Sequence, residues 1–157
     1  MAEPERRIEI RVDSPEASQE VATYLKEQGA GDIEQSEDVG IVPVIGLPFV
    51  IAALVGAAGL ASIVVYIART FGCMVVVDAR GDDIKVNRHC EIRGGRVILV
   101  AGEKTKIEVS EISPLFDFTA VAKTAVEQGA EAAKAAAEAA GATVKVLVPD
   151  EPVPGID

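Results

Sequence analysis

Residues 41–68 form an uninterrupted stretch without a single charge, IVPVIGLPFVIAALVGAAGLASIVVYIA. This stretch constrains the fold more than any other feature, because twenty helical residues extend about 30 Å, the thickness of a bilayer's hydrocarbon core. Pro43 and Pro48 disfavour a helix before residue 48. The pattern therefore predicts one long apolar, membrane-like helix over residues 48–69, within an apolar segment at 41–70.

Small residues recur along this predicted helix in two adjoining strips with four-residue spacing. Such ridges let two helix backbones approach closely, especially in bilayers. We expect them to form a helix-packing or oligomer interface made of Ala52, Ala53, Gly56, Ala57, Gly59 and Ala61. Near the end of the helix, Tyr66 and Arg69 occupy positions suited to membrane-interface anchors, one an interfacial ring and the other a snorkelling cation.

The apolar segment has three candidate environments: a bilayer, the centre of a homo-oligomer, or the interior of one chain. One chain of this size is expected to cover an all-round apolar helix poorly. Only Lys26 precedes the segment closely, whereas several cations follow it soon after, namely Arg69, Arg80, Lys85 and Arg88. The positive-inside rule then predicts a protein of the cytoplasmic membrane with its C-terminal part in the cytoplasm. The alternative location is the cytoplasm.

The N-terminal segment, residues 1–40, has the pattern of a β-α-β lobe. Apolar Ile8, Ile10 and Val12 alternate with charged neighbours, as in a half-buried strand. Ser14 and Pro15 favour a helix start, as N-cap and first helical residue. The sequence QGAG at residues 28–31 ends that helix, and the polar residues 32–38 follow as a second short strand or a loop.

The rest of the chain completes an expected α+β protein. Residues 71–113 hold four strand-like runs separated by GDD, RGG and GEK, and such short links predict a four-stranded antiparallel meander. The runs MVVV and RVILV are nearly continuously apolar, so we expect both of their faces to be covered. Residues 114–157 predict an Ala-rich helix with a break at Gly129, a C-terminal strand at 143–148 and a loose tail.

Charge and cysteine content limit the partners and the compartment. The net charge is −10, and nucleic-acid backbones require clustered Lys and Arg, so we expect no nucleic-acid partner. The start, MAEPERRIEIRVDS, lacks a basic-then-apolar leader, so no cleavable signal is expected. Cys73 and Cys90 are too few for a disulfide framework, which predicts a reducing compartment. A Cys73–Cys90 disulfide on an oxidising side is the alternative.

Candidate chemistry is sparse in this sequence. His89 and Cys90 are adjacent, but neighbouring strand residues point to opposite faces, which disfavours a nucleophile–base pair. Zinc requires four ligands, usually in paired spacings, and these residues with Cys73 do not supply them. We therefore predict a non-enzymatic protein with no catalytic residues, no cofactor and no metal. An enzyme that uses Cys90 and His89 is a third reading.

The order of a β-α-β lobe, an apolar helix and β-hairpins resembles the effector-associated constant component family of bacterial conflict systems. The matching stretches are RIEIRVDSPEASQEVATYLKEQG, GLPFVIAALVGAAGLASIVVYIAR and MVVVDARGDDIKV, within residues 7–86. The family's Gly-Met-Gly-like step at the helix start is replaced here by EDVGIVPVIG, and the Ala-rich C-terminal region is an addition. The resemblance implies a scaffold or adaptor near a membrane, with an effector protein as partner in a defence system.

These observations predict a self-assembling scaffold or adaptor, anchored in or inserted into a membrane. Its expected partners are further copies of the chain and membrane or apolar partner helices. The alternative function is a soluble homo-oligomeric structural protein whose apolar helices bundle in the core of the assembly.

Overall fold

A computed structural model describes residues 6–37, 47–81, 83–93, 95–102, 105–113, 116–148 and 153. Within these residues, eight strands form one mixed sheet in the order β2-β3-β1-β5-β4-β6-β7-β8. The strands are β1 (Arg6–Val12), β2 (Gly31–Glu37), β3 (Phe49–Val55), β4 (Cys73–Asp78), β5 (Ile84–Arg93), β6 (Val97–Ala101), β7 (Thr105–Ser110) and β8 (Thr143–Val146). The helices are α1 (Pro15–Glu27), α2 (Ala57–Phe71), α3 (Phe118–Gln128) and α4 (Ala130–Ala139).

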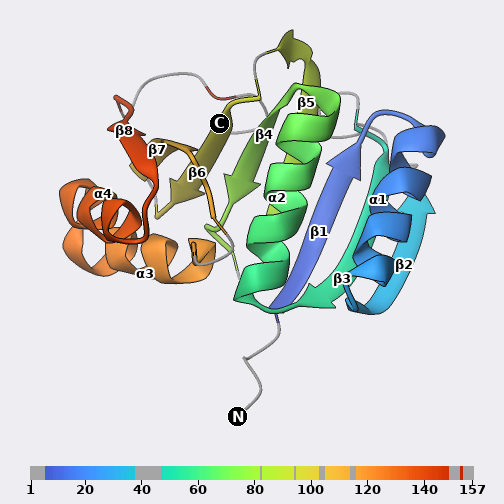
Figure 1. Ribbon diagram of the computed structural model, residues 1–157, viewed down its shortest axis with the longest axis horizontal. Helices are drawn as coiled ribbons and strands as arrows, with labels where there is room; N and C mark the ends of the chain where they lie inside the picture. The colour runs from blue at the N-terminus through green and yellow to red at the C-terminus, as the bar shows by residue number, and fades with distance from the viewer. Residues whose placement is uncertain are drawn as a thin grey trace.

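The helices lie on one face of the sheet, with α1 and α2 side by side over its N-terminal half (Figure 1). The main core lies between that face and side chains of all four helices. A smaller apolar cluster covers the other face of the central strands, formed by Met74, Val76, Ile98, Val100, Leu147 and Val153. Each of the four segments expected from the sequence (1–40, 41–70, 71–113 and 114–157) therefore contributes at least one strand to this single sheet.

The predicted N-terminal β-α-β arrangement is confirmed. Ser14 caps α1, because its side-chain oxygen accepts a hydrogen bond from the Ala17 amide at 3.1 Å, and Pro15 opens the helix. The polar residues after the helix form β2, which is parallel to β1 because β3 lies between them and is antiparallel to both. The first six elements thus follow the β-α-β-β-α-β order built on split βαβ units.

The predicted single long apolar helix is wrong. Phe49–Val55 form β3, and helix begins only after Gly56, the N-cap of α2. β3 pairs with β1 on one side and β2 on the other, so its apolar side chains serve an interior strand, where continuous apolar runs are common. The 15 residues of α2 extend only about 22 Å, short of a bilayer's hydrocarbon core. Residues 41–46, which begin the apolar segment, lie outside the described residues.

No helix in the described parts of the chain is long and apolar enough to cross a membrane, which overturns the predicted transmembrane helix. The inner side of α2 packs on its own sheet instead, and its core residues are Leu60, Ile63, Val64 and Ile67. A Cβ at Gly59 would lie 3.3 Å from the Cβ of Val55. Glycine at this position therefore lets the first turn of α2 lie close to β3 of the same chain.

The predicted four-stranded meander is also wrong. β4–β5 and β6–β7 are antiparallel hairpins, but β6 pairs in parallel with β4, and β5 lies instead along β1 in parallel. β4 and β6 are buried almost throughout, so their expected coverage on both faces is confirmed and explains their central positions. The link between the hairpins passes Gly95, where φ is 66° and a Cβ would lie 3.1 Å from the Ala68 carbonyl oxygen.

The Ala-rich region is divided as its sequence suggests. Gly129, with φ of 94°, lies between α3 and α4 and separates them. The Asp117 side chain caps α3 by accepting a hydrogen bond from the Ala120 amide at 3.1 Å. β8 then adds to β7 in antiparallel register at one end of the sheet.

For the cysteines, the structure agrees with the alternative prediction, a disulfide, at Cys73. Cys73 is disulfide-bonded, and Cys90 is the other cysteine of the chain. These residues belong to the paired strands β4 and β5, and the register between the strands shifts at Cys73–Met74. The disulfide of Cys73 therefore lies at the start of β4, beside a bulge in its pairing with β5.

Ile63→Ala is expected to lower the free energy of unfolding by about 2–5 kcal/mol, because it leaves a cavity at a fully buried site on α2. The matched control is Ser62→Ala at the neighbouring, less buried position, with an expected change within about 0.5 kcal/mol. Urea unfolding followed by far-ultraviolet circular dichroism measures both. Equal losses would contradict the placement of α2 on its own sheet.

Replacing both cysteines with serine is expected to lower the free energy of unfolding by about 3 kcal/mol, because it removes a disulfide that restricts the unfolded chain. Wild-type protein kept in a thiol reductant should unfold at the same urea concentration as the double variant. A double variant as stable as the oxidised protein would show that the bond contributes nothing to the folded state.

Candidate functional site: a groove over α2

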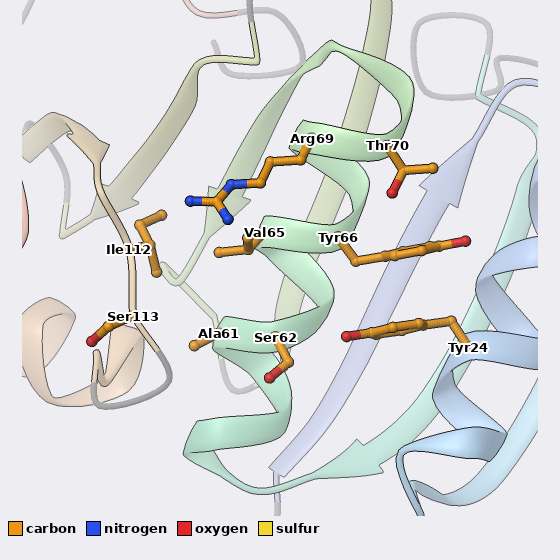
Figure 2. Close-up of a pocket in the computed structure, with 9 residues that line it drawn as sticks. All are labelled: Tyr24, Ala61, Ser62, Val65, Tyr66, Arg69, Thr70, Ile112 and Ser113. Atoms are coloured by element: carbon orange, nitrogen blue, oxygen red, sulfur yellow. The ribbon is translucent and has the colours of Figure 1, made fainter.

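A cavity of about 340 Å³ lies over the outer side of α2, and we name it the α2 groove. Figure 2 shows its floor on α2, one wall at Tyr24 of α1 and the other at Ile112 and Ser113, after β7. Three parts of the chain that are distant in sequence therefore meet here. The sheet positions α1 and α2 as neighbours on one face, and the segment that follows β7 supplies Ile112 and Ser113.

The helical period of α2 separates core residues from groove residues. Side chains at the inner positions are almost completely buried. The outer positions line the groove and are Ser62, Val65, Tyr66, Arg69 and Thr70, together with Ala61, which is buried and also belongs to the main core. Most of these outer residues remain partly or fully exposed, so the groove is open to a ligand.

Two tyrosine rings form one end of the α2 groove. Tyr24 and Tyr66 stack with ring centroids 4.0 Å apart and planes 8° from parallel. Stacked aromatic pairs of this kind contribute roughly 0.5–1.5 kcal/mol beyond the area that they bury. The pair joins α1 to α2 and presents a flat edge to the groove (Figure 2).

The environment of Tyr66 raises the pKa of its phenol above the ordinary 10.0. Burial is the main cause, and the negative charges of Glu20 and Glu27 add to it, followed by Tyr24. Each of these disfavours the phenolate. Tyr66 is therefore a neutral phenol at physiological pH, beside two carboxylates that make this end of the groove negative.

The other end of the α2 groove is cationic. Arg69 is exposed and makes no ion pair within the described part of the chain. Its guanidinium extends across the groove toward Ile112 (Figure 2). A guanidinium offers five N–H donors in a fixed plane, which suits a carboxylate or phosphate. The groove thus has a donor-rich end at Arg69 and an acidic, aromatic end at the tyrosines.

The residues predicted for membrane anchoring and for helix packing separate in the structure. Tyr66 and Arg69 both lie in the α2 groove. The predicted small-residue ridge does not exist as one helix face: Ala52 and Ala53 are in β3, Gly56 caps α2, Ala57 begins it, Gly59 lies against Val55, and Ala61 is on the groove floor. Ala53 belongs to the main core, and Ala52 points to the opposite sheet face.

The sequence did not indicate the walls of the α2 groove. Tyr24 falls between the apolar positions of α1, but its stacking partner lies 42 residues later on another helix. Ile112 and Ser113 precede the predicted break at Pro114 and carry no motif. Only the tertiary structure brings these residues to Arg69.

The third reading, an enzyme that uses Cys90 and His89, stays a prediction. His89 is fully buried on β5, opposite Met74 of β4. Cys73, whose side chain the structure describes, is disulfide-bonded and so is not a free thiol. Among the described residues, no group of three His, Cys, Asp or Glu side chains is placed to hold a metal ion.

Comparison with known proteins gives no relative for this chain: no family model, curated protein or solved structure matches it. The resemblance to the effector-associated family therefore stays a prediction. The residues at the two ends of the α2 groove therefore carry the proposed function.

The ionisation of Tyr66 can be isolated, because the chain has two tyrosines and Tyr24→Phe keeps an aromatic ring for stacking. In that variant we expect the remaining phenol to ionise above pH 10, as followed by phenolate ultraviolet absorbance. The folded state prefers the protonated phenol, so its contribution to stability is complete below pH 10 and is lost as pH rises through the raised pKa.

Adding Glu20→Gln to that variant should bring the pKa of Tyr66 closer to 10, because one negative charge is removed. Lys145→Gln, on β8, is the control substitution and should leave the titration unchanged. A titration midpoint at or below 10 would refute the assigned environment of the ring.

Proposed function

We propose that this chain is a non-enzymatic adaptor that binds an acidic segment of a partner protein in the α2 groove. The observation that carries the proposal is an exposed Arg69, without an ion pair among the described residues, in the same groove as a stacked tyrosine pair. Arginine and tyrosine dominate the residues on which binding free energy depends in protein interfaces. Hydroxyls of Ser62 and Thr70 supply further hydrogen-bonding groups along the groove.

The charges of the α2 groove favour an acidic partner segment in one orientation. A carboxylate beside Arg69 would accept paired hydrogen bonds from the guanidinium, and apolar groups beside it would contact Val65 and Ile112. Glu20 and Glu27 repel a second carboxylate at the tyrosine end. The partner segment therefore carries its acid at one end only.

This proposal retains the predicted adaptor function without the membrane anchor. An assembly that needs no membrane-spanning helix fits the structure better, because the apolar side of α2 is buried in its own chain. Further copies of the chain could contact α2 only through its outer side. Homo-oligomerisation stays a prediction. The family resemblance suggests an effector protein of a bacterial conflict system as the partner class.

Selection from a random peptide library is expected to enrich segments with one Asp or Glu next to apolar residues. Arg69→Glu should weaken binding of the best enriched peptide by about a hundredfold, because it replaces attraction by repulsion at the carboxylate. Fluorescence polarisation of the labelled peptide measures the affinity. Lys145→Glu, an exposed charge reversal on β8, is the matched control and should have little effect.

Enriched peptides without an acidic residue, or equal losses in the two variants, would overturn the proposal. Sedimentation equilibrium of the protein alone separates a foreign partner from a second copy. A monomer supports a foreign partner. A dimer that Arg69→Glu dissociates would assign the groove to self-association instead.

A further inference from the structure

The outermost strand β2 leaves one side of its backbone without a neighbouring strand. Within the described residues, β2 ends the sheet and pairs only with β3. It is seven residues long and largely exposed, and Figure 1 shows it at the rim beyond α1. Unpaired N–H and C=O groups on such an edge can bind an extended peptide as an added strand.

A second cavity, of about 530 Å³, lies between α1 and this edge, and we name it the edge groove. Ala22, Ala30 and Ile33 form its apolar part, and its other lining residues are Gln19, Thr23, Gln35 and, at the α1 side, Lys26. The Ser18 hydroxyl donates a hydrogen bond to Oε1 of Gln35 at 3.2 Å, which ties β2 to α1 along the groove. Side chains alternate across a sheet, so every second residue of an added strand would lie over this groove.

The register of β2 shows which part of the edge suits pairing. It pairs regularly with β3 from Glu34 to Glu37. Between Gly31 and Glu34 the register shifts, and Asp32 has φ of 48° in the left-handed region. Bulges bend and twist an edge locally and weaken its use as a template. An added strand would therefore pair with residues 34–37.

The acidic residues of β2 itself select the occupant of its open edge. β2 itself carries Asp32, Glu34 and Glu37 and no base. Two copies of β2 would place like charges opposite each other, which is destabilising. A segment rich in Lys or Arg would pair its charges with this strand.

We infer that the open edge of β2 and the edge groove bind an extended basic segment of a partner protein by strand addition, with apolar side chains over Ile33. This inference uses residues of α1 and β2 only. It therefore stands or fails separately from the proposal for the α2 groove.

Two synthetic peptides of equal length test the inference, one alternating Lys with Val and the other Glu with Val. With the full chain, we expect the lysine peptide to bind at least about tenfold more tightly than the glutamate peptide. It should also slow amide hydrogen exchange at residues 34–37, as measured by nuclear magnetic resonance. Lysine-peptide binding without added protection of β2 would reduce the effect to general charge attraction and overturn the inference.

Thr23→Trp fills the edge groove from an exposed position on α1 and should weaken lysine-peptide binding about tenfold. Gln28→Trp, a neutral and exposed position that does not line this groove, is the matched control. Equal effects of the two variants would overturn the inference.

Reversing Glu34 and Glu37 to lysine should make the glutamate peptide the tighter ligand, because these charges select the partner. An unchanged preference for the lysine peptide would count against the inference. Protection of β2 that rises with protein concentration alone would assign the edge to a second copy and overturn the inference as well.

Discussion

The packing of α2 on the middle of its own sheet is the interaction on which the rest of the structure depends. Ile63, Val64 and Ile67 are completely buried there. Their burial brings β3 and β4, which flank α2 in sequence, into one sheet with β1 and β5 between them. At roughly 25 cal/mol for each Å² of apolar surface removed from water, three such side chains make a substantial contribution to folding. The sheet therefore covers the apolar surface of α2 that a bilayer would otherwise bury.

This packing also decides which surfaces are left for binding. Once the inner side of α2 is buried, its outer side keeps the polar, aromatic and cationic residues of the α2 groove. β3 takes a position inside the sheet, which leaves β2 on the outside. The acidic sequence of β2 suits an outer strand, because charge on an edge opposes pairing with further copies. The strand pairing that places the apolar β3 inside the sheet therefore also leaves the acidic β2 at the edge.

Local patterns in the sequence predicted the elements whose signals are local. The alternation at Ile8, Ile10 and Val12 specified β1, and Ser14 with Pro15 specified the start of α1. Gly129 marked the break between the last two helices. Each of these depends on neighbouring residues only, so no knowledge of the tertiary structure was required.

Two features failed because they depend on distant partners. Phe49–Val55 is as apolar as a helix core, and what makes it a strand is pairing with β1 and β2 on either side. The hairpin pattern of residues 71–113 could not reveal that β5 prefers β1 to β6. Among the residues of the α2 groove, the sequence analysis singled out Tyr66 and Arg69 by residue type, but interpreted them as membrane anchors. Their proximity to Tyr24 could not be read from the sequence.

α1 lies between the two proposed binding surfaces, the α2 groove and the edge groove. Tyr24 faces the α2 groove, whereas Thr23 and Gln19 line the edge groove on the other flank of the helix. Val21 and Leu25 between them are buried in the main core, so α1 is held against the sheet. Coupling between sites requires an element with two arrangements that both ligands bias. Because this packing holds α1 against the sheet, we expect an acidic and a basic partner to bind on its two flanks independently.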